Sequence, residues 1–524
     1  MSAAETILLP AQVEAVEAAH EGKFRTHLSE IGRQSSIAFA GTVFTLVLGY
    51  AFRVYLARQL GARLLGWNAI GMGLYGICKL LGEFGMPASA LRFAGIYKAG
   101  SGRANLTAFF WRALFWTLFG TSLFCALVLL GRGWIATRVF HDAALIRFLP
   151  LYAILIPIGA ASSFLTQTLG GFKMIARSTA IVKFISFPFM IVASIVALAL
   201  GLSLWGFVVA QIAGEVLIFI LAGCSIWRAA PVPLQWDELR GSALSSDVRW
   251  YALAMTGMGV LGFLAGQADR LVLGYYLPAK QVGIYSVAAS AGGLCAIFLQ
   301  ALNSIFAPTI ALLHEQSEHA LLLRLYQTLT KWILAVTLPV VLTFLFLPRS
   351  IMGLFGSDFQ SGWLVLCVIT VGQIVNCGTG SVGYLLQMSG NQNRVVRVTL
   401  IMAVLMTVTN IVLIPRCGVA GAAAVSAVGT ILGNSTYLVM VRRSLRLFPY
   451  ERSYWKLLPA AAAAAGVLWL IRGQVAMLCR PITTVLFGFM AASVIFLVTF
   501  VGSGLTRDDR LVVDMAKRRL QSLV

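Results

Sequence analysis

Two stretches of this chain are degenerate copies of one another: RVYLARQLGARLLGWNAI, beginning at Arg53, and RLVLGYYLPAKQVGIYSV, beginning at Arg270. Aligned without a gap, they pair Arg53 with Arg270 and Gly66 with Gly283. The sequence therefore predicts an internal duplication. Repeats that flank a central site are typical of membrane carriers that expose the site to each side of the membrane in turn. The duplication thus favours a transporter.

The composition places most of the chain in a lipid bilayer. Of its 524 residues, 59% are apolar and 11% are charged, and the mean hydropathy is +0.86. A soluble core cannot bury this much apolar side chain. A bilayer core needs roughly 20 apolar residues per helix, and the hydropathy pattern predicts about 14 such spans. We therefore expect an all-α polytopic membrane protein.

The distribution of basic residues predicts the orientation. In a soluble protein, the formal charge of +21 would indicate nucleic-acid binding. Here, an amino terminus in the cytoplasm places roughly 26 Lys and Arg residues inside and roughly 10 outside, as the positive-inside rule requires. We expect both termini in the cytoplasm and no nucleic-acid partner. The first 34 residues or so are polar, so the first span is expected to serve as the insertion signal.

The expected organisation follows the duplication, with an even number of spans in each repeat and hence one shared membrane orientation. The two last spans have no counterpart in the duplication and form an accessory pair. The tail is either an amphipathic basic helix on the anionic inner leaflet or a solvated charged segment. The expected units are a cytoplasmic N-terminal segment (1–34), a six-span N-lobe (35–227), a cytoplasmic linker (228–249), a six-span C-lobe (250–441), a basic loop with accessory spans (442–504) and the cytoplasmic tail (505–524).

Two features argue against an enzyme or a metalloprotein. The eight cysteines are scattered singly, without CxxC or Cys/His spacing, so we expect no metal and no disulfide. The external loops are short, which leaves no room for a folded catalytic domain. We therefore expect no enzymatic activity, and a membrane polysaccharide polymerase or ligase is the alternative from another functional class.

The segment ADRLVLGYYLPAKQVGIYSVAASAGGL, from Ala268, contains Asp-Arg, Leu-Gly and Gly-x-Tyr in order. It resembles the opening of the second half of bacterial polysaccharide-export flippases, the Wzx-type flippases of O-antigen and exopolysaccharide. These belong to the multidrug/oligosaccharidyl-lipid/polysaccharide (MOP) exporter superfamily. The segment LGWNAIGMGLYGICKLLGEFGMPASALRFAGIY, from Leu65, is similar to the second span of the same family, with Trp67 and Asn68 departing from its pattern.

The resemblance implies a MATE-like V of two six-helix lobes around a central cavity, in the bacterial inner membrane. It implies transport of a polyprenyl-pyrophosphate-linked oligosaccharide, a polysaccharide repeat unit, from the cytoplasmic to the periplasmic leaflet by alternating access. The implied partners are this lipid-linked substrate, membrane lipids, and possible polymerase and export machinery. The alternatives within the superfamily are a lipid II flippase and a multidrug or cation antiporter.

Charged residues inside the spans are costly in lipid and identify candidate site residues. Arg53 and Arg270 are repeat mates near the outer ends of their spans, which places them on the wall between the lobes. Arginine binds phosphate oxygens through two planar donors and stays ionised, so the pair suits a pyrophosphate. In the alternative, Arg270 neutralises a carboxylate on a neighbouring helix and Arg53 reaches the membrane interface.

Lys79 and Glu83 are four residues apart and can form an ordinary helical ion pair. If Glu83 bonds elsewhere, Lys79 is a cavity cation near the cytoplasmic mouth, beside Arg92, and both join the expected pyrophosphate site. The intramembrane charges lean basic, which disfavours an extruder of cationic drugs.

Glu215 and Asp269 are candidates for coupling to an ion or proton, because a carboxylate in apolar surroundings can bind and release a proton as the cavity changes. A structural hydrogen-bonding role is the alternative for both. We expect no cofactor; transport can be coupled to a proton gradient, a sodium gradient or the membrane potential. The expected polar side chains of the cavity wall are Gln211, Gln300, Asn303, Gln373 and Asn376.

Overall fold

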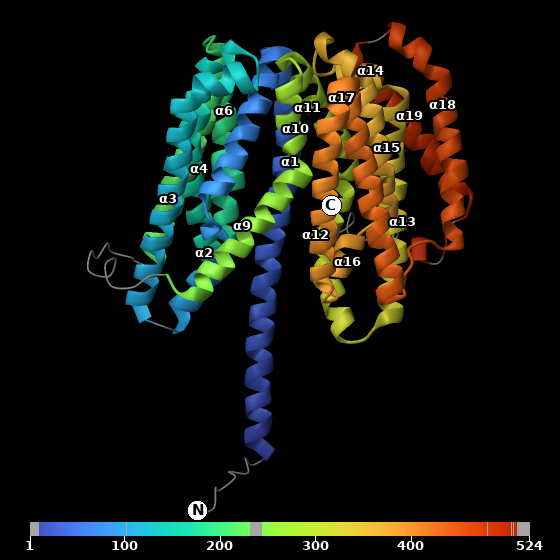
Figure 1. The fold of residues 1–524 in the computed structure, drawn as a ribbon. Helices are drawn as coiled ribbons and strands as arrows, with labels where there is room; N and C mark the ends of the chain where they lie inside the picture. Colours follow the sequence, from blue (N-terminus) through green and yellow to red (C-terminus); the bar gives the residue numbers. More distant parts are fainter. Residues whose placement is uncertain are drawn as a thin grey trace, which may run out of the picture.

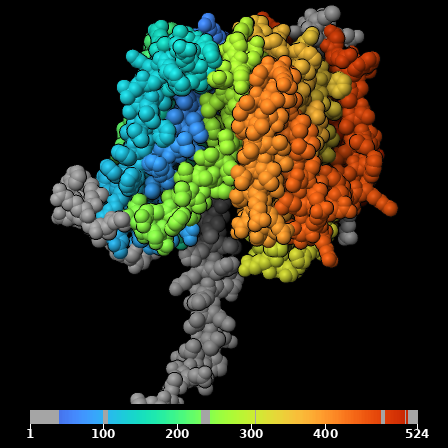
Figure 2. Space-filling model, viewed as in Figure 1, coloured from blue at the N-terminus to red at the C-terminus, as the bar shows by residue number. Residues whose placement is uncertain are grey.

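The computed structural model describes residues 10–100, 102–230, 244–478, 480–504, 506 and 508–510. Within these residues all regular structure is helical and no strand occurs. Figure 1 shows two helical bundles that meet at one end and separate toward the other, and Figure 2 shows the notch between them. The expected all-α polytopic fold with two lobes in a V is confirmed.

The helices follow the chain order of the two repeats. The first repeat contains α1 (Pro10–Gly82), α2 (Met86–Gly100), α3 (Gly102–Trp134), α4 (Leu149–Gly171), α5 (Ile175–Thr179), the π-helical η3 (Ala180–Ser186), α6 (Phe187–Ala199) and α7 (Ser203–Ala229). The second contains α9 (Ser246–Gly266), α10 (Ala268–Tyr276), α11 (Ala279–Gly293), α12 (Ile297–Glu315), α13 (His319–Phe346), α14 (Pro348–Gly353), α15 (Trp363–Thr379), α16 (Val382–Met388) and α17 (Gln392–Leu445). The accessory pair is α18 (Leu457–Leu478) and α19 (Pro481–Gly502).

The described ranges contain 12 helices that are long and apolar enough to cross a membrane, so the expected count of 14 is not confirmed. Two of them, Ala40–Gly82 with 43 residues and Gln392–Leu445 with 54, exceed the roughly 20 residues that one crossing needs. Each contains one residue outside helical geometry, Gly61 (φ 72°, ψ 175°) or Gly418 (φ 59°, ψ −143°). The chain bends at these glycines, and each long helix covers two of the expected spans.

Positive-φ residues lie at corresponding positions in the two repeats. Gly201, between α6 and α7, has φ 78°. Gly418 is its repeat mate, because these two glycines are separated by the same number of residues as Arg53 and Arg270. Lys173 (φ 60°) and Gly390 (φ 79°) form a second pair at this spacing. Left-handed backbone is unfavourable for residues with a Cβ, which explains glycine at three of the four positions. The repeats therefore change direction at matching points.

The two repeats cross at a pair of small-residue motifs, Ala62-x-x-x-Gly66 in α1 and Ala279-x-x-x-Gly283 in α11. A Cβ placed on Gly66 would lie 1.7 Å from the Ala279 carbonyl oxygen, and one placed on Gly283 would lie 1.9 Å from the Ala62 carbonyl oxygen. The four residues are repeat mates, so the contact is reciprocal. Small residues allow two backbones this close approach, and the crossing joins the bundles at the upper end in Figure 1.

Helix α9 connects the two bundles. By sequence it opens the second repeat, yet its residues Val248 and Ala252 pack in the hydrophobic cluster of α2, α3, α4 and α7. A Cβ on Gly85 would lie 2.1 Å from the Ala252 carbonyl oxygen. Gln267 interrupts the helix, with φ −141°, and α10 continues from it. In Figure 1, α9 runs from the lower end of the first bundle to α10.

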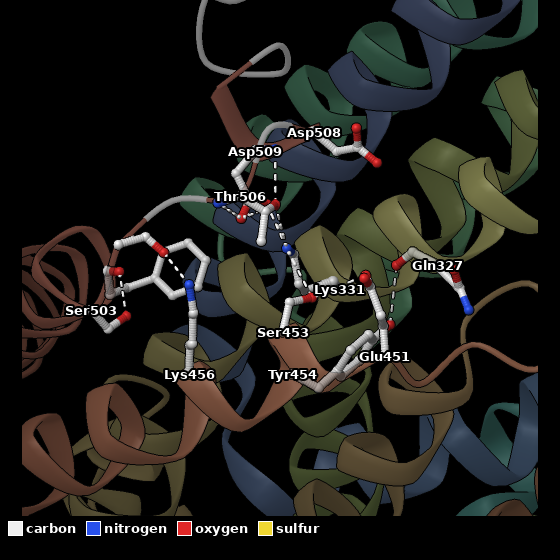
Figure 3. A network of polar contacts seen from close by, with 12 residues as sticks. Gln327, Lys331, Glu451, Ser453, Tyr454, Lys456, Ser503, Thr506, Asp508 and Asp509 are labelled. Carbon is white, nitrogen blue, oxygen red and sulfur yellow. Dashed lines mark hydrogen bonds and ion pairs between the residues drawn. The ribbon is translucent and has the colours of Figure 1, made fainter.

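Asp508 and Asp509, which follow α19, attach to the second bundle through ion pairs, and Figure 3 shows the one between Asp509 and Lys331. Lys331 Nζ in α13 lies 2.6 Å from Asp509 Oδ1, and these side chains are 5% and 2% exposed. The Thr506 backbone N–H and hydroxyl both donate to Asp509. Arg324, about two turns earlier in α13, pairs with Asp508 at the surface. The accessory helices are thereby fastened to α13.

Some expected units lie partly outside the described residues. These are residues 231–243 of the linker and residues 505, 507 and 511–524 of the tail, together with residues 1–9, Ser101 and Cys479. The described part of the expected N-terminal segment, 10–34, is the beginning of α1.

Candidate functional site

A cavity of about 520 Å³ lies between the two repeats. Both halves of α1, with α6 and α7, form its wall on one side, and α10 and α11 form it on the other. Among the residues that the structure describes, the charged ones on this wall are Arg53 and Arg270, and no described carboxylate lines it. The cavity is therefore positively charged. Its polar residues are Thr45, Tyr50, Arg53, Asn68, Tyr75, Gln211, Gln267, Arg270 and Ser286.

The two arginines share the cavity without being neutralised. Both guanidinium groups line one cavity, and like charges repel each other. Among the described residues no carboxylate forms an ion pair with either, and the buried Nε of Arg270 has no hydrogen-bond partner. The carboxylate adjacent in sequence, Asp269, accepts hydrogen bonds from the Tyr285 hydroxyl (2.6 Å) and the Arg270 backbone N–H (2.8 Å). The guanidinium of Arg270 is thus left available to a ligand.

The structure does not bring Lys79 and Arg92 onto this wall. Lys79 Nζ lies 3.6 Å from Glu83 Oε1, the ordinary helical pair, and 5.8 Å from the ring centre of Tyr75. The Arg92 guanidinium packs over the ring of Tyr251 in α9, 4.7 Å from its centre. Lys79 therefore lies behind Tyr75, which lines the cavity. Arg92 contributes to the packing of α9 on the first repeat.

Glu215 lies in the first repeat, beside the main cavity. Its carboxylate accepts a hydrogen bond from Ser162 in α4. Glu215 and Gln211, one turn apart in α7, line a smaller cavity of about 190 Å³, and Gln211 also lines the main one. Gln211 is thus the residue among the expected polar candidates that reaches the main cavity.

The remaining candidates make contacts elsewhere. Both carboxylate oxygens of Asp269 accept hydrogen bonds, which favours the structural alternative for that residue. Asn303 accepts from Ser381 (2.5 Å), and Asn376 donates to Gln373 (2.9 Å) within α15. Gln300 lines a separate, apolar cavity. These amides connect helices of the second repeat or lie away from the two arginines.

Several wall residues were not anticipated from the sequence. Tyr50 lies three residues before Arg53 on the same helix face, so helical spacing could have identified it. Asn68 and Tyr75 lie on the second half of α1, and Gln267 lies at the break before α10. No sequence pattern marks these three, because the wall they share is formed by helices distant in the chain.

An apolar cavity of about 330 Å³ adjoins the main one. It lies between the first half of α1 and the junction of α11 with α12, and it shares Leu46 and Tyr50 with the charged cavity. Its other lining residues are Thr42, Val43, Val47, Leu294, Ile297, Gln300 and Ala301. An apolar chamber thus lies directly beside a cationic one.

Comparison with known protein families identifies residues 55–362 as a match to the family described as polysaccharide biosynthesis protein. Two curated relatives come from Haloferax volcanii: a probable low-salt glycan biosynthesis flippase, 23% identical over 210 residues, and a second probable flippase, 24% identical over 209 residues. The matches cover 40% and 39% of this chain, and 44% and 43% of the relatives. The chain therefore spans less than half the length of these relatives.

Solved structures of transporters share the fold. The lipid II flippase MurJ in its inward closed conformation superposes with a TM-score of 0.65 at 16% identity, over 88% of this chain and 97% of that one. An inward-facing multidrug resistance MATE transporter of the MOP superfamily superposes at 0.59 with 14% identity, over 77% and 94%. At these identities the superpositions show the fold. The chain belongs to the polysaccharide biosynthesis protein family and has the fold of the MOP exporter superfamily.

Proposed function

We propose that this protein is a flippase that moves a polyprenyl-pyrophosphate-linked oligosaccharide from the cytoplasmic to the outer leaflet of the bacterial inner membrane by alternating access. The observation that carries the proposal is the pair of repeat-mate arginines, Arg53 and Arg270, which lack carboxylate partners on the wall of one cavity between the lobes. Both curated relatives are described as probable flippases, which supports this class of transport.

Each part of such a substrate meets matching chemistry. The two guanidinium groups bind the pyrophosphate through paired charge-assisted hydrogen bonds. Amide and hydroxyl side chains on the same wall, among them Asn68, Gln211 and Gln267, hydrogen-bond to the sugar. The adjoining apolar cavity accepts the beginning of the polyprenyl chain, whose remainder stays in lipid. Three chemical regions of one amphiphile thus correspond to neighbouring regions of the protein.

The membrane potential favours the proposed direction. Moving a negative charge out of an inside-negative cell releases about 2.3 kcal/mol per charge per 100 mV. The empty cavity, with its two positive charges, is drawn back toward the inside. The export cycle can therefore run on the potential, and an ion gradient adds to it. Polymerase and export machinery are the proposed downstream partners of the delivered glycan.

The test is the double variant Arg53→Gln/Arg270→Gln, with Arg92→Gln as the matched control outside the cavity. We expect the double variant to lose flipping of a fluorescent polyprenyl-pyrophosphate glycan in proteoliposomes, and to lose surface polysaccharide in cells, while it folds normally. Loss of two charge-assisted interactions of about 1.5–3 kcal/mol each accounts for at least a tenfold effect. The control should retain transport.

Three results would overturn the proposal. The first is normal transport by the double variant. The second is preferential transport of lipid II or of a cationic drug by the wild-type protein under the same conditions. The third is covalent elongation of the glycan by the purified protein, which would indicate a polymerase or ligase.

A further inference from the structure

One face of the first half of α1 carries apolar residues and then an arginine. Val43, Val47 and Tyr50 line the apolar cavity of about 330 Å³. At helical spacing, the same face continues through Val54 to Arg58. Arg58 is exposed and lies about 12 Å beyond Tyr50 along the helix axis, close to the end at which the two bundles meet. The face therefore leads from an apolar cavity to a cation.

Arg58 is held across the gap between the two repeats. Its Nε donates to the carbonyl oxygen of Leu354, the residue directly after α14, at 2.7 Å. Among the described residues no carboxylate forms an ion pair with Arg58. A backbone carbonyl carries no net charge, so the positive charge of Arg58 is not compensated. A phosphate in place of this carbonyl would form a stronger, charge-assisted bond and can engage two donors of the planar guanidinium.

The corresponding gap on the other side of the molecule is packed. By the repeat spacing, α9 and α10 are the counterpart of the first half of α1, and Leu80 is the counterpart of Ile297, which lines the apolar cavity. A Cβ placed on Gly259 of α9 would lie 2.8 Å from Leu80 Cδ1. One placed on Gly76 would lie 3.2 Å from the ring of Phe263. Helix α9 therefore packs on the second half of α1, whereas the first half of α1 leaves the apolar cavity beside α12.

The counterpart of Arg58 differs in charge. It is Tyr275, at the spacing that relates the two cavity arginines. The ring of Tyr275 also contacts the opposite repeat, at His141 in the connection between α3 and α4, with the ring centres 5.7 Å apart. Both residues thus join the repeats at this end, but the one with a positive charge lies on the side of the apolar cavity. The cation and the apolar cavity occur together on one side of the molecule.

We propose that Arg58 binds the pyrophosphate of the lipid-linked substrate at the outer face of the membrane, while the first part of the polyprenyl chain occupies the apolar cavity. This step rests on the proposed function, which places this end of the molecule at the outer leaflet. In the closed structure the Leu354 carbonyl occupies the guanidinium. A phosphate oxygen takes the place of that carbonyl when the headgroup leaves the main cavity.

Arg53 and Arg58 serve different stages because they face different sides of α1. Five residues separate them, which places Arg58 about 7.5 Å nearer the outer end and about 140° around the helix axis. Tyr50 lies between the two directions and lines both the main cavity and the apolar one. The departing headgroup therefore moves outward and around α1, toward the lipid in which its polyprenyl chain already lies.

The test is photolabelling of the purified full-length protein with a photoreactive derivative of farnesyl pyrophosphate, a short polyprenyl pyrophosphate. The measurement uses the Arg53→Gln/Arg270→Gln background, which lacks the cations of the main cavity. Mass spectrometry of the labelled peptides should place the label on the first half of α1 and on the junction of α11 with α12. Unlabelled farnesyl pyrophosphate should compete. A photoreactive farnesol, which lacks the pyrophosphate, reports binding by the apolar cavity alone.

Adding Arg58→Gln should lower the apparent affinity for the pyrophosphate probe at least about tenfold, the loss expected for a charge-assisted hydrogen bond. Labelling by the farnesol probe should not change. Arg63→Gln is the matched control, because this exposed arginine lies beyond the bend at Gly61 and packs over the ring of Trp67, 4.9 Å from its centre. Arg58→Lys keeps the charge and should keep part of the affinity for pyrophosphate.

Three results would overturn the proposal. The first is an unchanged affinity for the pyrophosphate probe in Arg58→Gln. The second is an equal loss for both probes, which would show that Arg58 only fastens α1 to Leu354. The third is competition by phosphatidylglycerol as effective as that by farnesyl pyrophosphate, which would show a site for ordinary anionic phospholipids.

Failure of this proposal can be distinguished from failure of the flippase proposal. The photolabelling measures binding in a protein without the cavity cations, so a negative result leaves the role of Arg53 and Arg270 in transport intact. Normal transport by the Arg53→Gln/Arg270→Gln variant would overturn the flippase proposal and would not change the labelling that depends on Arg58.

Discussion

Lys331 and Asp509 form a buried ion pair where the accessory helices attach to α13. Removing two charges from water is costly, and their mutual attraction recovers this cost only when other hydrogen bonds satisfy the remaining atoms. Ser453 and Thr506 fill that role, with oxygens 3.3 Å and 3.4 Å from Lys331 Nζ. The pair therefore acts as a set of mutually dependent contacts, and loss of one member leaves the other charge unpaired.

We expect Asp509→Asn to destabilise the protein by about 3–5 kcal/mol, because Lys331 then remains as an uncompensated buried charge. Asp508→Asn is the matched control, since the adjacent pair with Arg324 is exposed and such pairs contribute at most about 1 kcal/mol. Urea unfolding of the purified protein measures both. An equal decrease in the free energy of unfolding in the two variants would contradict the claim that Asp509→Asn leaves Lys331 as an uncompensated buried charge.

The same pair predicts a dependence on pH. Burial raises the pKa of Asp509, but hydrogen bonds from Lys331 and Thr506, with the attraction of the Lys331 charge, outweigh burial and hold the pKa below its usual value. A depressed folded-state pKa contributes stability above the unfolded-state value of about 3.9. That contribution is lost as the pH falls through the lower folded-state pKa. The stability difference between wild type and Asp509→Asn should be constant from about pH 5 to pH 8 and shrink below about pH 4.

At the scale of elements, α9 links the two lobes because its ends pack on different repeats. Its first half packs on α2 through Val248 and Ala252, while α10, beyond the break at Gln267, presents Arg270 to the cavity. A change in the angle between the lobes must therefore bend the chain near Gln267 or release α9 from the first repeat. Breaks between packed segments are where such motion is usually absorbed.

Gly85→Ala tests the attachment of α9. The new Cβ would lie 2.1 Å from the Ala252 carbonyl oxygen, and the residue has φ 66°. Gly390→Ala is the matched control, since its φ of 79° imposes the same backbone strain while nothing lies within 4 Å of the new Cβ. We expect faster hydrogen exchange of the α9 amides in Gly85→Ala and unchanged exchange there in Gly390→Ala. Equal exchange in both variants would show that α9 is held by other contacts.

At the scale of the whole molecule, the reciprocal crossing of α1 and α11 closes the V at one end. Gly66 faces Ala279 and Gly283 faces Ala62, so each repeat supplies the same small surface to the other. The crossing has no space for side chains at either glycine. Under the alternating access proposed above, the cavity would open on this side when the two motifs separate. The contact could re-form because it requires close approach rather than interlocking side chains.

Gly66→Ala should shift the molecule toward the state that is open at this end, because its Cβ would clash with backbone atoms at 1.7 Å. Gly262→Ala in α9, with nothing within 4 Å of the new Cβ, is the control. With Ser286→Cys as a reporter on the cavity wall, a membrane-impermeant maleimide applied from outside should label Gly66→Ala several times faster than the control. Equal labelling rates would refute the crossing as the closure.

The sequence by itself determined the membrane environment, the duplication and the pairing of Arg53 with Arg270. Hydropathy and repeat spacing are properties of the sequence, so they can be recognised without knowing which helices contact each other. The expected count of 14 spans is not confirmed, because at Gly61 and Gly418 the chain turns within one continuous helix. The charges of Lys79 and Arg92 made them candidates for the cavity wall. Only the tertiary structure shows that Lys79 pairs with Glu83 and that Arg92 packs on Tyr251.

The tertiary structure decided which faces of the helices meet. It placed Asn68, Tyr75 and Gln267 on one wall and left Ser186 without a partner beside Glu215. The physical reason is that a helix in lipid shows which residues are apolar but not how far it is rotated against its neighbours. That rotation is set by close packing between segments remote in the chain, and in this protein it also separates a cationic cavity from the carboxylate next to it.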